Sequence, residues 1–395
     1  MIPYARQHVD QTDIDAVVEV LRADFLTQGP VVPRFEAAVA ARSKARYAVA
    51  FNSATSALHA ACLALNLRPG ARLWTVPNTF VASANCARYC GAAVDFVDID
   101  PATWNMSSAE LEARLVQARR ANALPDVVVP VHFGGQPTEQ ERIHALAREY
   151  GFRIVEDASH SLGGERHGEP VGSCRWSDIT VFSFHPAKII TTGEGGMALT
   201  NDAGLAASLA MFRSHGITRD PNRFQQPAAF ASDRTEPAAW HYEQHALGFN
   251  YRLTDIHAAL GLSQLARLEE FVSRRNLLAS RYQQMLQGLP LRLPAIQPGN
   301  RSAFHLYVVR LNGANGSHIR RQTFDALRQR GVGVNVHYMP VHLQPYYRAL
   351  GFLEGQFPES EAHGATAITL PLYPRLTETQ QDEVVTALRQ VLAHA

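Results

Sequence analysis

One lysine, Lys188, has the surroundings expected of a reactive amine. It follows the apolar, β-branched stretch 179–183 and precedes the glycine-rich turn 193–196. Desolvation by such neighbours disfavours the ammonium form of a lysine, so the pKa falls and the free amine becomes available. A free amine is the nucleophile that forms a Schiff base with a carbonyl compound. The sequence therefore predicts a Schiff-base lysine at position 188.

A phosphate-binding helix start is predicted at residues 52–58, Asn-Ser-Ala-Thr-Ser-Ala-Leu, directly after the apolar stretch 47–51. Free backbone N–H groups and the positive end of the helix dipole favour an anion at such a position. Ser183, five residues before Lys188, could add a hydroxyl donor. An ordinary helix N-cap would explain the same small hydroxyl residues, so this motif alone leaves both interpretations open.

Three further residues lie at or near predicted strand ends. Phe80 follows the apolar stretch 72–76, where ligands of open α/β sheets bind, and could stack on a flat ring, although a lone phenylalanine also fits a core position. Asp157 ends the apolar stretch 153–156 and could keep a pyridine nitrogen protonated. His160 could donate to a phenolic oxygen. A capping aspartate with a structural histidine would fit this pair as well.

Together these residues match the phosphate, the ring, the ring nitrogen and the aldehyde of pyridoxal phosphate (PLP). Each signal has a structural explanation when taken alone. Their order along the chain is more specific, because phosphate helix, aromatic residue, strand-end aspartate and Ser-x-x-x-x-Lys follow one another beside successive predicted strands. The sequence therefore predicts a PLP site.

The elements that must position these residues alternate between strands and helices. Alternation of this kind predicts parallel βαβ units with helices on both faces of the sheet. Residues 1–250 are expected to form a large α/β domain, and residues 251–395 an interdomain helix with a smaller α+β domain. Residues 219–239 lack periodicity and predict a long loop, either a linker or a functional flap. The expected strands are 47–51, 72–76, 93–99, 126–133, 153–156, 179–184, 197–200, 305–311 and 333–337, and the expected helices are 9–24, 34–43, 53–65, 81–90, 108–119, 138–150, 254–286, 319–330 and 378–392.

Composition argues against several other classes of protein. The chain has 395 residues, 46% of them hydrophobic and 18% charged, as in ordinary globular proteins. A net charge of +1 gives no strong field for nucleic acid or an anionic membrane. Its four cysteines show neither a disulfide framework nor a metal-binding spacing, and no signal peptide or membrane span is evident. We therefore expect a cytoplasmic protein with no metal, nucleic-acid or membrane partner.

Over nearly its whole length the chain resembles the fold-type I PLP aminotransferases that act on nucleotide-linked keto sugars, often called the DegT/StrS family. The resemblance rests on motifs that recur in order. They are Leu26-Thr-Gln-Gly, Asn52-Ser-Ala-Thr-Ser-Ala-Leu, Phe80-Val-Ala-Ser-Ala-Asn, Glu156-Asp-Ala-Ser-His, Ser183-Phe-His-Pro-Ala-Lys, Thr191-Thr-Gly-Glu-Gly-Gly, Phe212-Arg-Ser-His-Gly, Gly248-Phe-Asn-Tyr-Arg-Leu and Val336-His-Tyr-Met-Pro.

The resemblance implies a role for each matching residue. Lys188 would bind the cofactor covalently, Asp157 would pair with the pyridine nitrogen, and His160 would lie near the phenolic oxygen. The other residues expected at the cofactor are Phe80 on the ring, Ala54, Thr55 and Ser183 at the phosphate, and Asn250 at the phosphate of the neighbouring subunit. The residues expected at the sugar nucleotide are Tyr4, Asp24, Phe25, Leu26, Thr27, His337 and Tyr338.

The implied reaction is transamination of a nucleotide-linked 4-keto-6-deoxy hexose, with L-glutamate as donor, in a homodimer with a shared active site. Within the family the chain looks most like the transaminases of pseudaminic acid biosynthesis, whose substrate is UDP-2-acetamido-2,6-dideoxy-β-L-arabino-hexos-4-ulose. Another UDP- or dTDP-linked keto sugar is the alternative, and a non-catalytic regulatory protein with this fold is a remote one. Lys188 argues against a sugar dehydratase, in which histidine replaces it. The absence of Gly-x-Gly-x-x-Gly after the first strand argues against a Rossmann dehydrogenase.

Overall fold

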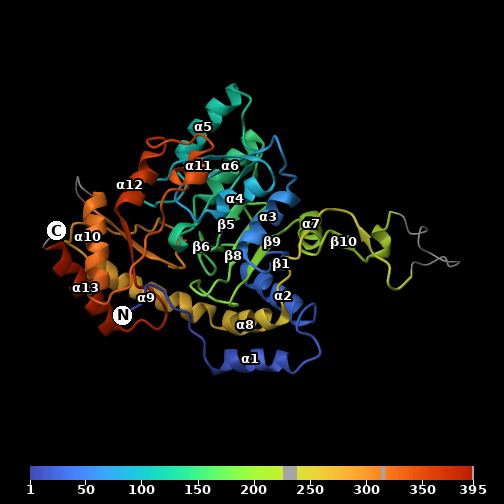
Figure 1. The fold of residues 1–395 in the computed structure, drawn as a ribbon, viewed down its shortest axis with the longest axis horizontal. Helices are drawn as coiled ribbons and strands as arrows, with labels where there is room; N and C mark the ends of the chain where they lie inside the picture. The colour runs from blue at the N-terminus through green and yellow to red at the C-terminus, as the bar shows by residue number, and fades with distance from the viewer. Residues whose placement is uncertain (226–237, 313–315, 394–395) are drawn as a thin grey trace.

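A seven-stranded sheet in the order β1-β9-β8-β5-β4-β2-β3 forms the centre of the computed structural model, which describes residues 1–225, 238–312 and 316–393 (Figure 1). The strands β8, β5, β4, β2 and β3 pair in parallel, and β9 is antiparallel to both of its neighbours. The predicted α/β class is therefore confirmed, with one reversed strand. The bounds are β1 (Tyr47–Phe51), β2 (Arg72–Thr75), β3 (Ala93–Phe96), β4 (Val127–Val128), β5 (Arg153–Asp157), β8 (Ile179–Ser183) and β9 (Gly196–Thr200).

Helices cover both faces of this sheet because its strands are apolar on both sides. Along β8, Ile179 and Val181 point into the core under α3, α4 and α7, whereas Phe182 points into the core on the opposite face. That opposite face is covered by α2, α8, α5 and α6. These helices are α2 (Val31–Ser43), α3 (Ala54–Ala64), α4 (Ala82–Tyr89), α5 (Ser108–Arg120), α6 (Gln140–Tyr150), α7 (Ala203–Arg213) and α8 (Asp255–Ala266).

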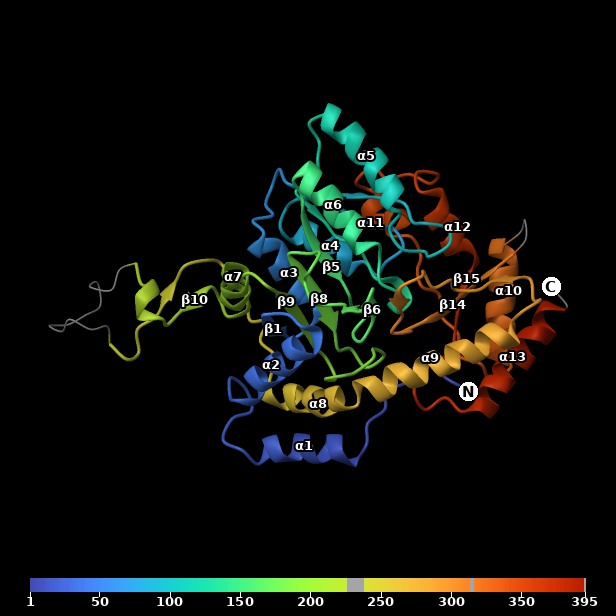
Figure 2. The same ribbon diagram turned by 180° about the vertical axis from the view of Figure 1, so that it is seen from behind.

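A smaller sheet, β12-β14-β15, belongs to the second part of the chain. Its core includes Tyr307 and Ile368 from the strands and Leu388 from the last helix. The helices α8 and α9 run end to end from beneath the large sheet to α13 (Figure 2). The bounds are α9 (Leu268–Met285), β12 (Leu291–Arg292), β14 (Tyr307–Leu311), α10 (Gly316–Gln329), β15 (Ala367–Leu370) and α13 (Glu378–Leu392).

The predicted helical stretch 254–286 is confirmed with one break, because α8 ends and α9 begins at Arg267. The backbone of Arg267 (φ −103°, ψ 10°) departs from α-helical values. Its guanidinium pairs with Asp10 and Asp13 at the start of α1 (Gln11–Leu21), which lies along α8. The break therefore coincides with a long-range contact to α1. The periodicity of residues 254–286 gives no information about this contact.

Two predicted strands differ from the structure. The strand expected at 126–133 shortens to β4, since Pro130 lacks the N–H that a central strand must donate. The strand expected at 333–337 is absent. Its residue Asn335 forms only an isolated bridge to Thr369, and β15, which the sequence analysis missed, occupies the edge of the smaller sheet. A third sheet, β13-β6-β7, was also missed; its strands are β6 (Glu165–Arg166), β7 (Glu169–Pro170) and β13 (Asn300–Arg301).

Residues 217–225 and 238–244, on either side of the undescribed part of the predicted loop 219–239, belong to a hairpin-like projection. The strands β10 (Ile217–Thr218) and β11 (Glu243–Gln244) pair antiparallel, and this projection stands away from the sheet in both views (Figures 1 and 2). Residues 226–237 of the loop lie outside the described part of the chain. In the part of the chain that the structure describes, no helix is both long enough and apolar enough to cross a bilayer.

Candidate active site

A cavity of about 540 Å³ lies at the carboxyl ends of β5 and β8 and the start of α3. Predicted residues from distant parts of the sequence share its wall. Those from the sheet and its helices are Ala54, Thr55, Phe80, Asp157, His160, Ser183 and Lys188. Those predicted to contact the sugar nucleotide are Tyr4, His337 and Tyr338.

Lys188 lies in the loop that joins β8 to the antiparallel strand β9. Both ends of this loop are held, because Ser183 pairs with Gly196 and the N–H of Phe184 donates to the carbonyl of Gly195 at 2.9 Å. Burial lowers the pKa of Lys188 to about 8, although the negative charge of Asp157 acts in the opposite direction. The neutral fraction of this amine near physiological pH is therefore far larger than that of an ordinary lysine, in the direction that the sequence analysis predicts.

The pKa of Lys188 has a consequence for stability. An ammonium with a folded-state pKa of about 8 and an ordinary value of 10.5 destabilises the fold below pH 8, and this penalty disappears as the pH rises to 10.5. We expect Lys188→Met to stabilise the cofactor-free protein at pH 7 by about 2 kcal/mol, allowing for partial exposure of the side chain to the cavity. Urea unfolding at pH 7 and pH 10.5 measures this difference. The exposed Lys44 provides the control Lys44→Met, and an equal effect of both substitutions would contradict the prediction.

Asp157 ends β5 and is held by two hydrogen bonds. Its Oδ2 accepts from the Ser83 hydroxyl at 2.6 Å, and its Oδ1 accepts from the Ser159 N–H at 3.1 Å. Ser83 in turn contacts the Thr79 hydroxyl at 2.8 Å. The carboxylate is thus fixed in one orientation at the cavity wall. Sequence analysis assigned no role to Ser83, and no helical spacing signals its contact with Thr79, because Thr79 lies in the bend before α4.

The start of α3 forms the opposite end of the cavity. Ser53 caps the helix, and its hydroxyl accepts from the Ser56 N–H at 3.1 Å. The N–H groups of Ala54 and Thr55 belong to the first turn and have no partner within the helix, so they can bind an anion. A side chain on Gly196 would bring its Cβ within 2.4 Å of the Ala54 nitrogen. Only glycine therefore allows β9 to approach this helix start so closely.

Substitution of Gly196 should disturb both the fold and anion binding at this site. The obstructing atoms are backbone atoms of residues 53 and 54, so Gly196→Ala requires a main-chain shift. We expect a loss of about 1–3 kcal/mol in the free energy of unfolding and at least about tenfold weaker PLP binding. Thermal unfolding and absorbance titration with PLP measure the two effects. Gly204→Ala, in α7, is the control and should leave both unchanged or raise stability slightly.

His160 and Tyr338 form a hydrogen-bonded pair on the cavity wall. The Nδ1 atom of His160 accepts from the Gly134 N–H at 3.3 Å, so Nε2 carries the proton of the neutral ring. That proton points to the Tyr338 hydroxyl, 3.1 Å away. Burial lowers the pKa of His160 and raises that of Tyr338, so both groups stay neutral. The Tyr338 hydroxyl therefore accepts a hydrogen bond from His160 and can donate its own proton to another acceptor.

Phe80 and the pair formed by Tyr4 and His337 lie on other parts of the wall. The Phe80 side chain is 59% exposed and its ring centroid is 6.4 Å from that of Tyr338, so an open ring face is available for stacking. The rings of Tyr4 and His337 are 5.7 Å apart. Burial lowers the pKa of His337 to about 3, and its Nδ1 contacts the Thr369 hydroxyl at 2.7 Å.

His305 also lines the cavity, and the sequence analysis placed it only at the start of a strand. Its Nε2 is 3.4 Å from the Lys188 Nζ, across 117 residues of sequence. Burial and the neighbouring Lys188 hold the pKa of His305 well below its ordinary value. No local pattern around residue 305 signals this contact, since it depends on how the second part of the chain folds onto the first.

Five predicted residues do not line the cavity. The Leu26 carbonyl accepts from the Asp255 N–H at 3.0 Å, and Thr27 forms a bridge to Thr254, so this segment lies at the start of α8. Asn250 is exposed and forms a bridge to Ser214. The single chain does not bring these residues to Lys188, and their roles stay predictions. The residues concerned are Asp24, Phe25, Leu26, Thr27 and Asn250.

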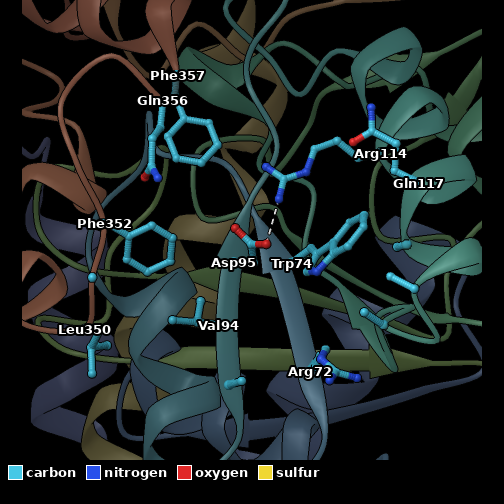
Figure 3. A pocket seen from close by; sticks show the side chains of 15 residues that line it. Arg72, Trp74, Val94, Asp95, Arg114, Gln117, Leu350, Phe352, Gln356 and Phe357 are labelled. Atoms are coloured by element: carbon cyan, nitrogen blue, oxygen red, sulfur yellow. Dashed lines mark hydrogen bonds and ion pairs between the residues drawn. The ribbon is translucent and has the colours of Figure 1, made fainter.

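A second hollow, of about 710 Å³, lies against β2, β3 and α5 (Figure 3). Arg114 points across it to Asp95, with 2.6 Å between Nη2 and Oδ2, and its guanidinium carbon lies 5.1 Å from the centre of the Trp74 ring. The charged groups at its centre therefore satisfy one another. None of the predicted site residues lines this hollow, so the cavity around Lys188 is the candidate active site.

The residues of the Lys188 cavity fit PLP. The first turn of α3 and the close approach of Gly196 suit a phosphate, and the open face of Phe80 suits a flat ring. Asp157 offers a fixed carboxylate for a protonated ring nitrogen, and Lys188 offers an amine of lowered pKa for the aldehyde.

Comparison with known proteins agrees with this fit. The sequence matches the DegT/DnrJ/EryC1/StrS aminotransferase family over residues 7–389. It is 35% identical over 398 residues to the spore coat polysaccharide biosynthesis protein SpsC of Bacillus subtilis, covering 100% of this chain and 98% of SpsC. The fold is similar to Helicobacter pylori PseC, an aminotransferase involved in the biosynthesis of pseudoaminic acid (TM-score 0.88, 28% identity, 100% of both chains). It is also similar to the PLP form of Spr1654 from Streptococcus pneumoniae (TM-score 0.87, 27% identity, 100% and 99% of the chains).

These similarities extend over the whole chain and confirm the predicted fold-type I architecture, the aminotransferase activity and the cofactor. The protein is a PLP-dependent sugar aminotransferase and belongs to the DegT/DnrJ/EryC1/StrS family.

Proposed function

We propose that this enzyme transfers the amino group of L-glutamate to C4 of a UDP-linked 4-keto-6-deoxy hexose, and that its substrate is UDP-2-acetamido-2,6-dideoxy-β-L-arabino-hexos-4-ulose in pseudaminic acid biosynthesis. The observation that carries the reaction type is the buried amine of Lys188, with a pKa of about 8, in one cavity with Asp157 and the start of α3. The similarity to PseC over the full length of both chains supports the choice of sugar.

The mechanism follows from what each residue does around the cofactor. Bound PLP supplies an aldehyde and a ring that withdraws electrons, which makes the C–H bond beside the transferred amino group acidic. Lys188 would hold the aldehyde through its Nζ, and once the amino donor has released it, the neutral Nζ would accept a proton from the donor carbon. Asp157 would hold a proton on the ring nitrogen. Phe80 would pack on the ring and exclude water from it.

The same groups serve the second half of the reaction in reverse. The Lys188 Nζ would then deliver a proton to C4 of the sugar, which is the reverse of its task in the first half. Two half-reactions that share one site give ping-pong kinetics. Tyr4, His337 and Tyr338 lie on the cavity wall beside the cofactor residues, and we propose that they contact the sugar nucleotide.

We further propose that the active site is shared in a homodimer. Asn250 and residues 24–27 do not line the cavity of their own chain, and Phe25 and Leu26 are 56% and 47% exposed. In a dimer, Asn250 of one subunit would contact the cofactor phosphate bound by the other subunit. Residues 24–27 would contact the sugar nucleotide bound there. We also propose that residues 1–250 and residues 251–395 form two separate domains.

Incubation with L-glutamate and a panel of UDP- and dTDP-linked 4-keto hexoses tests the substrate. We expect amination of the UDP-linked N-acetyl sugar of β-L-arabino configuration with the highest kcat/KM, measured by mass spectrometry of the product. Amination of dTDP sugars alone would overturn the pseudaminic assignment while leaving the aminotransferase activity intact.

A further inference from the structure

His305 is the histidine in contact with the reactive amine. Its Nε2 lies 3.4 Å from the Lys188 Nζ, at the long end of hydrogen-bond distances. The side chain is almost fully buried, with 3% of its surface exposed. Its ring also packs against His160, with 4.5 Å between the ring centroids. His305 is therefore fixed in the protein interior, and it meets the Lys188 amine at the wall of the cavity.

The backbone that carries His305 is held by a buried cation. Arg275, in α9, donates from Nη1 to the carbonyl oxygens of Phe304 at 3.2 Å, His305 at 3.3 Å and Leu372 at 3.0 Å. Only 1% of Arg275 is exposed. Burial, the charge of Lys188 and, to a smaller extent, the charge of Arg275 keep the pKa of His305 well below its ordinary value. The imidazole is therefore neutral and carries one proton.

The position of that proton decides what His305 does. Among the described residues, the buried Nδ1 of His305 has no hydrogen-bond partner. A buried N–H without an acceptor is rarer and more costly than a buried acceptor without a donor. The proton is therefore better placed on Nε2, where it points to Lys188, than on Nδ1. An Nε2–H group can only donate, and the only acceptor that a lysine offers is the lone pair of its neutral amine.

We propose that His305 donates a hydrogen bond from Nε2 to the lone pair of Lys188 Nζ and thereby holds this amine in its neutral, reactive form. The inference rests on the proposed function in one respect, namely that the free amine is the proton carrier. The opposite tautomer makes the opposite prediction, because an Nε2 that accepts from an ammonium would stabilise the protonated lysine.

Other groups also act on Lys188, and they must stay constant in a test. Asp157 favours the ammonium, whereas burial opposes it. The remaining titratable groups around the cavity are Tyr4, His160, His185, Glu194, His337 and Tyr338. None of these is changed by a substitution at residue 305, so a variant there isolates the contribution of one hydrogen bond.

The chain is well suited to such a measurement because it contains only two lysines, Lys44 and Lys188. Amine labelling of the full-length, cofactor-free protein, followed by peptide mass spectrometry from pH 6 to 10, gives the rate for each lysine in the same sample. Lys44 lies exposed at the end of α2 and serves as the internal reference. His305→Phe removes both ring nitrogens and keeps an aromatic side chain, and His305→Gln retains an amide N–H that can donate to Lys188.

We expect His305→Phe to raise the pKa of Lys188 and to reduce its labelling at pH 7, relative to Lys44, by about tenfold, which corresponds to one pKa unit. His305→Gln should keep most of the wild-type labelling. A fall or no change in the pKa of Lys188 in His305→Phe would overturn the proposal, as would equal behaviour of the two variants. Circular dichroism and the melting temperature verify that each variant is folded.

The labelling experiment uses neither substrate nor cofactor, so its outcome is independent of the substrate panel. If no keto sugar is aminated but the labelling changes as expected, the substrate assignment fails and the role of His305 stands. If the sugar is aminated and the labelling does not change, the substrate assignment stands and the proposed role of His305 fails.

Discussion

Replacing Lys188 with alanine should lower kcat by about 10⁴-fold or more, because one side chain provides both the covalent link to the cofactor and the proton transfer. The visible absorbance of the bound cofactor should change at the same time, since the link to the lysine is lost. Rapid kinetics with glutamate and an absorbance spectrum of the purified variant measure the two effects. Activity within tenfold of the wild type would contradict the assignment of Lys188.

Two controls separate the roles of Lys188. Lys188→Arg keeps the positive charge, but a guanidinium is protonated at all relevant pH values and cannot accept the proton, so it should be as inactive as Lys188→Ala. Addition of a small primary amine such as methylamine should restore part of the activity of Lys188→Ala, because the cavity of about 540 Å³ has room for it. Activity of Lys188→Arg without added amine would argue that charge, and not proton transfer, is what the lysine provides.

Replacing Asp157 with asparagine should lower kcat by about 10²- to 10³-fold while the cofactor stays bound. The amide occupies the same volume and can still accept from Ser83, whose hydroxyl is 2.6 Å from the carboxylate. What is lost is the negative charge that keeps the ring nitrogen protonated. Stopped-flow measurement of each half-reaction and the absorbance of the bound cofactor verify that the chemical step, and not binding, has changed.

Ser83→Ala provides the matched control for Asp157. It removes one hydrogen bond from the carboxylate and leaves the charge, so a loss of about tenfold or less is expected. If Asp157→Asn and Ser83→Ala reduce kcat equally, the carboxylate charge is not the decisive property, and the assignment of Asp157 to the ring nitrogen is wrong.

The proximity of Asp157, Ser183 and Lys188 was predictable because they lie at or just after the ends of neighbouring strands of one sheet. Asp157 and Ser183 end β5 and β8, which are parallel neighbours, so local patterns and the rule for open α/β sheets bring them together. Lys188 follows a few residues after Ser183. Local sequence was sufficient here, because each residue could be placed from the strand that it ends or closely follows.

The rest of the site was not predictable from local pattern. His305 meets Lys188 across 117 residues, and the pairing of Tyr338 with His160 spans 178 residues. The same limit explains the errors in the fold. The break at Arg267 coincides with an ion pair to α1. The strand that pairs with β14 is β15, and not residues 333–337. In each case a tertiary contact decided the outcome.

The close approach of Gly196 to the start of α3 has a further consequence. Gly196 also pairs with Ser183, so a single residue joins the loop of Lys188 to the start of α3. The position of Lys188 relative to this helix start is therefore set by one short main-chain connection, which we call the Gly196 unit. His305 and Tyr338 belong to segments after residue 300, outside this unit. A substitution in those later segments would therefore reach Lys188 through the cavity wall alone, and would leave the main-chain link between its loop and the start of α3 in place.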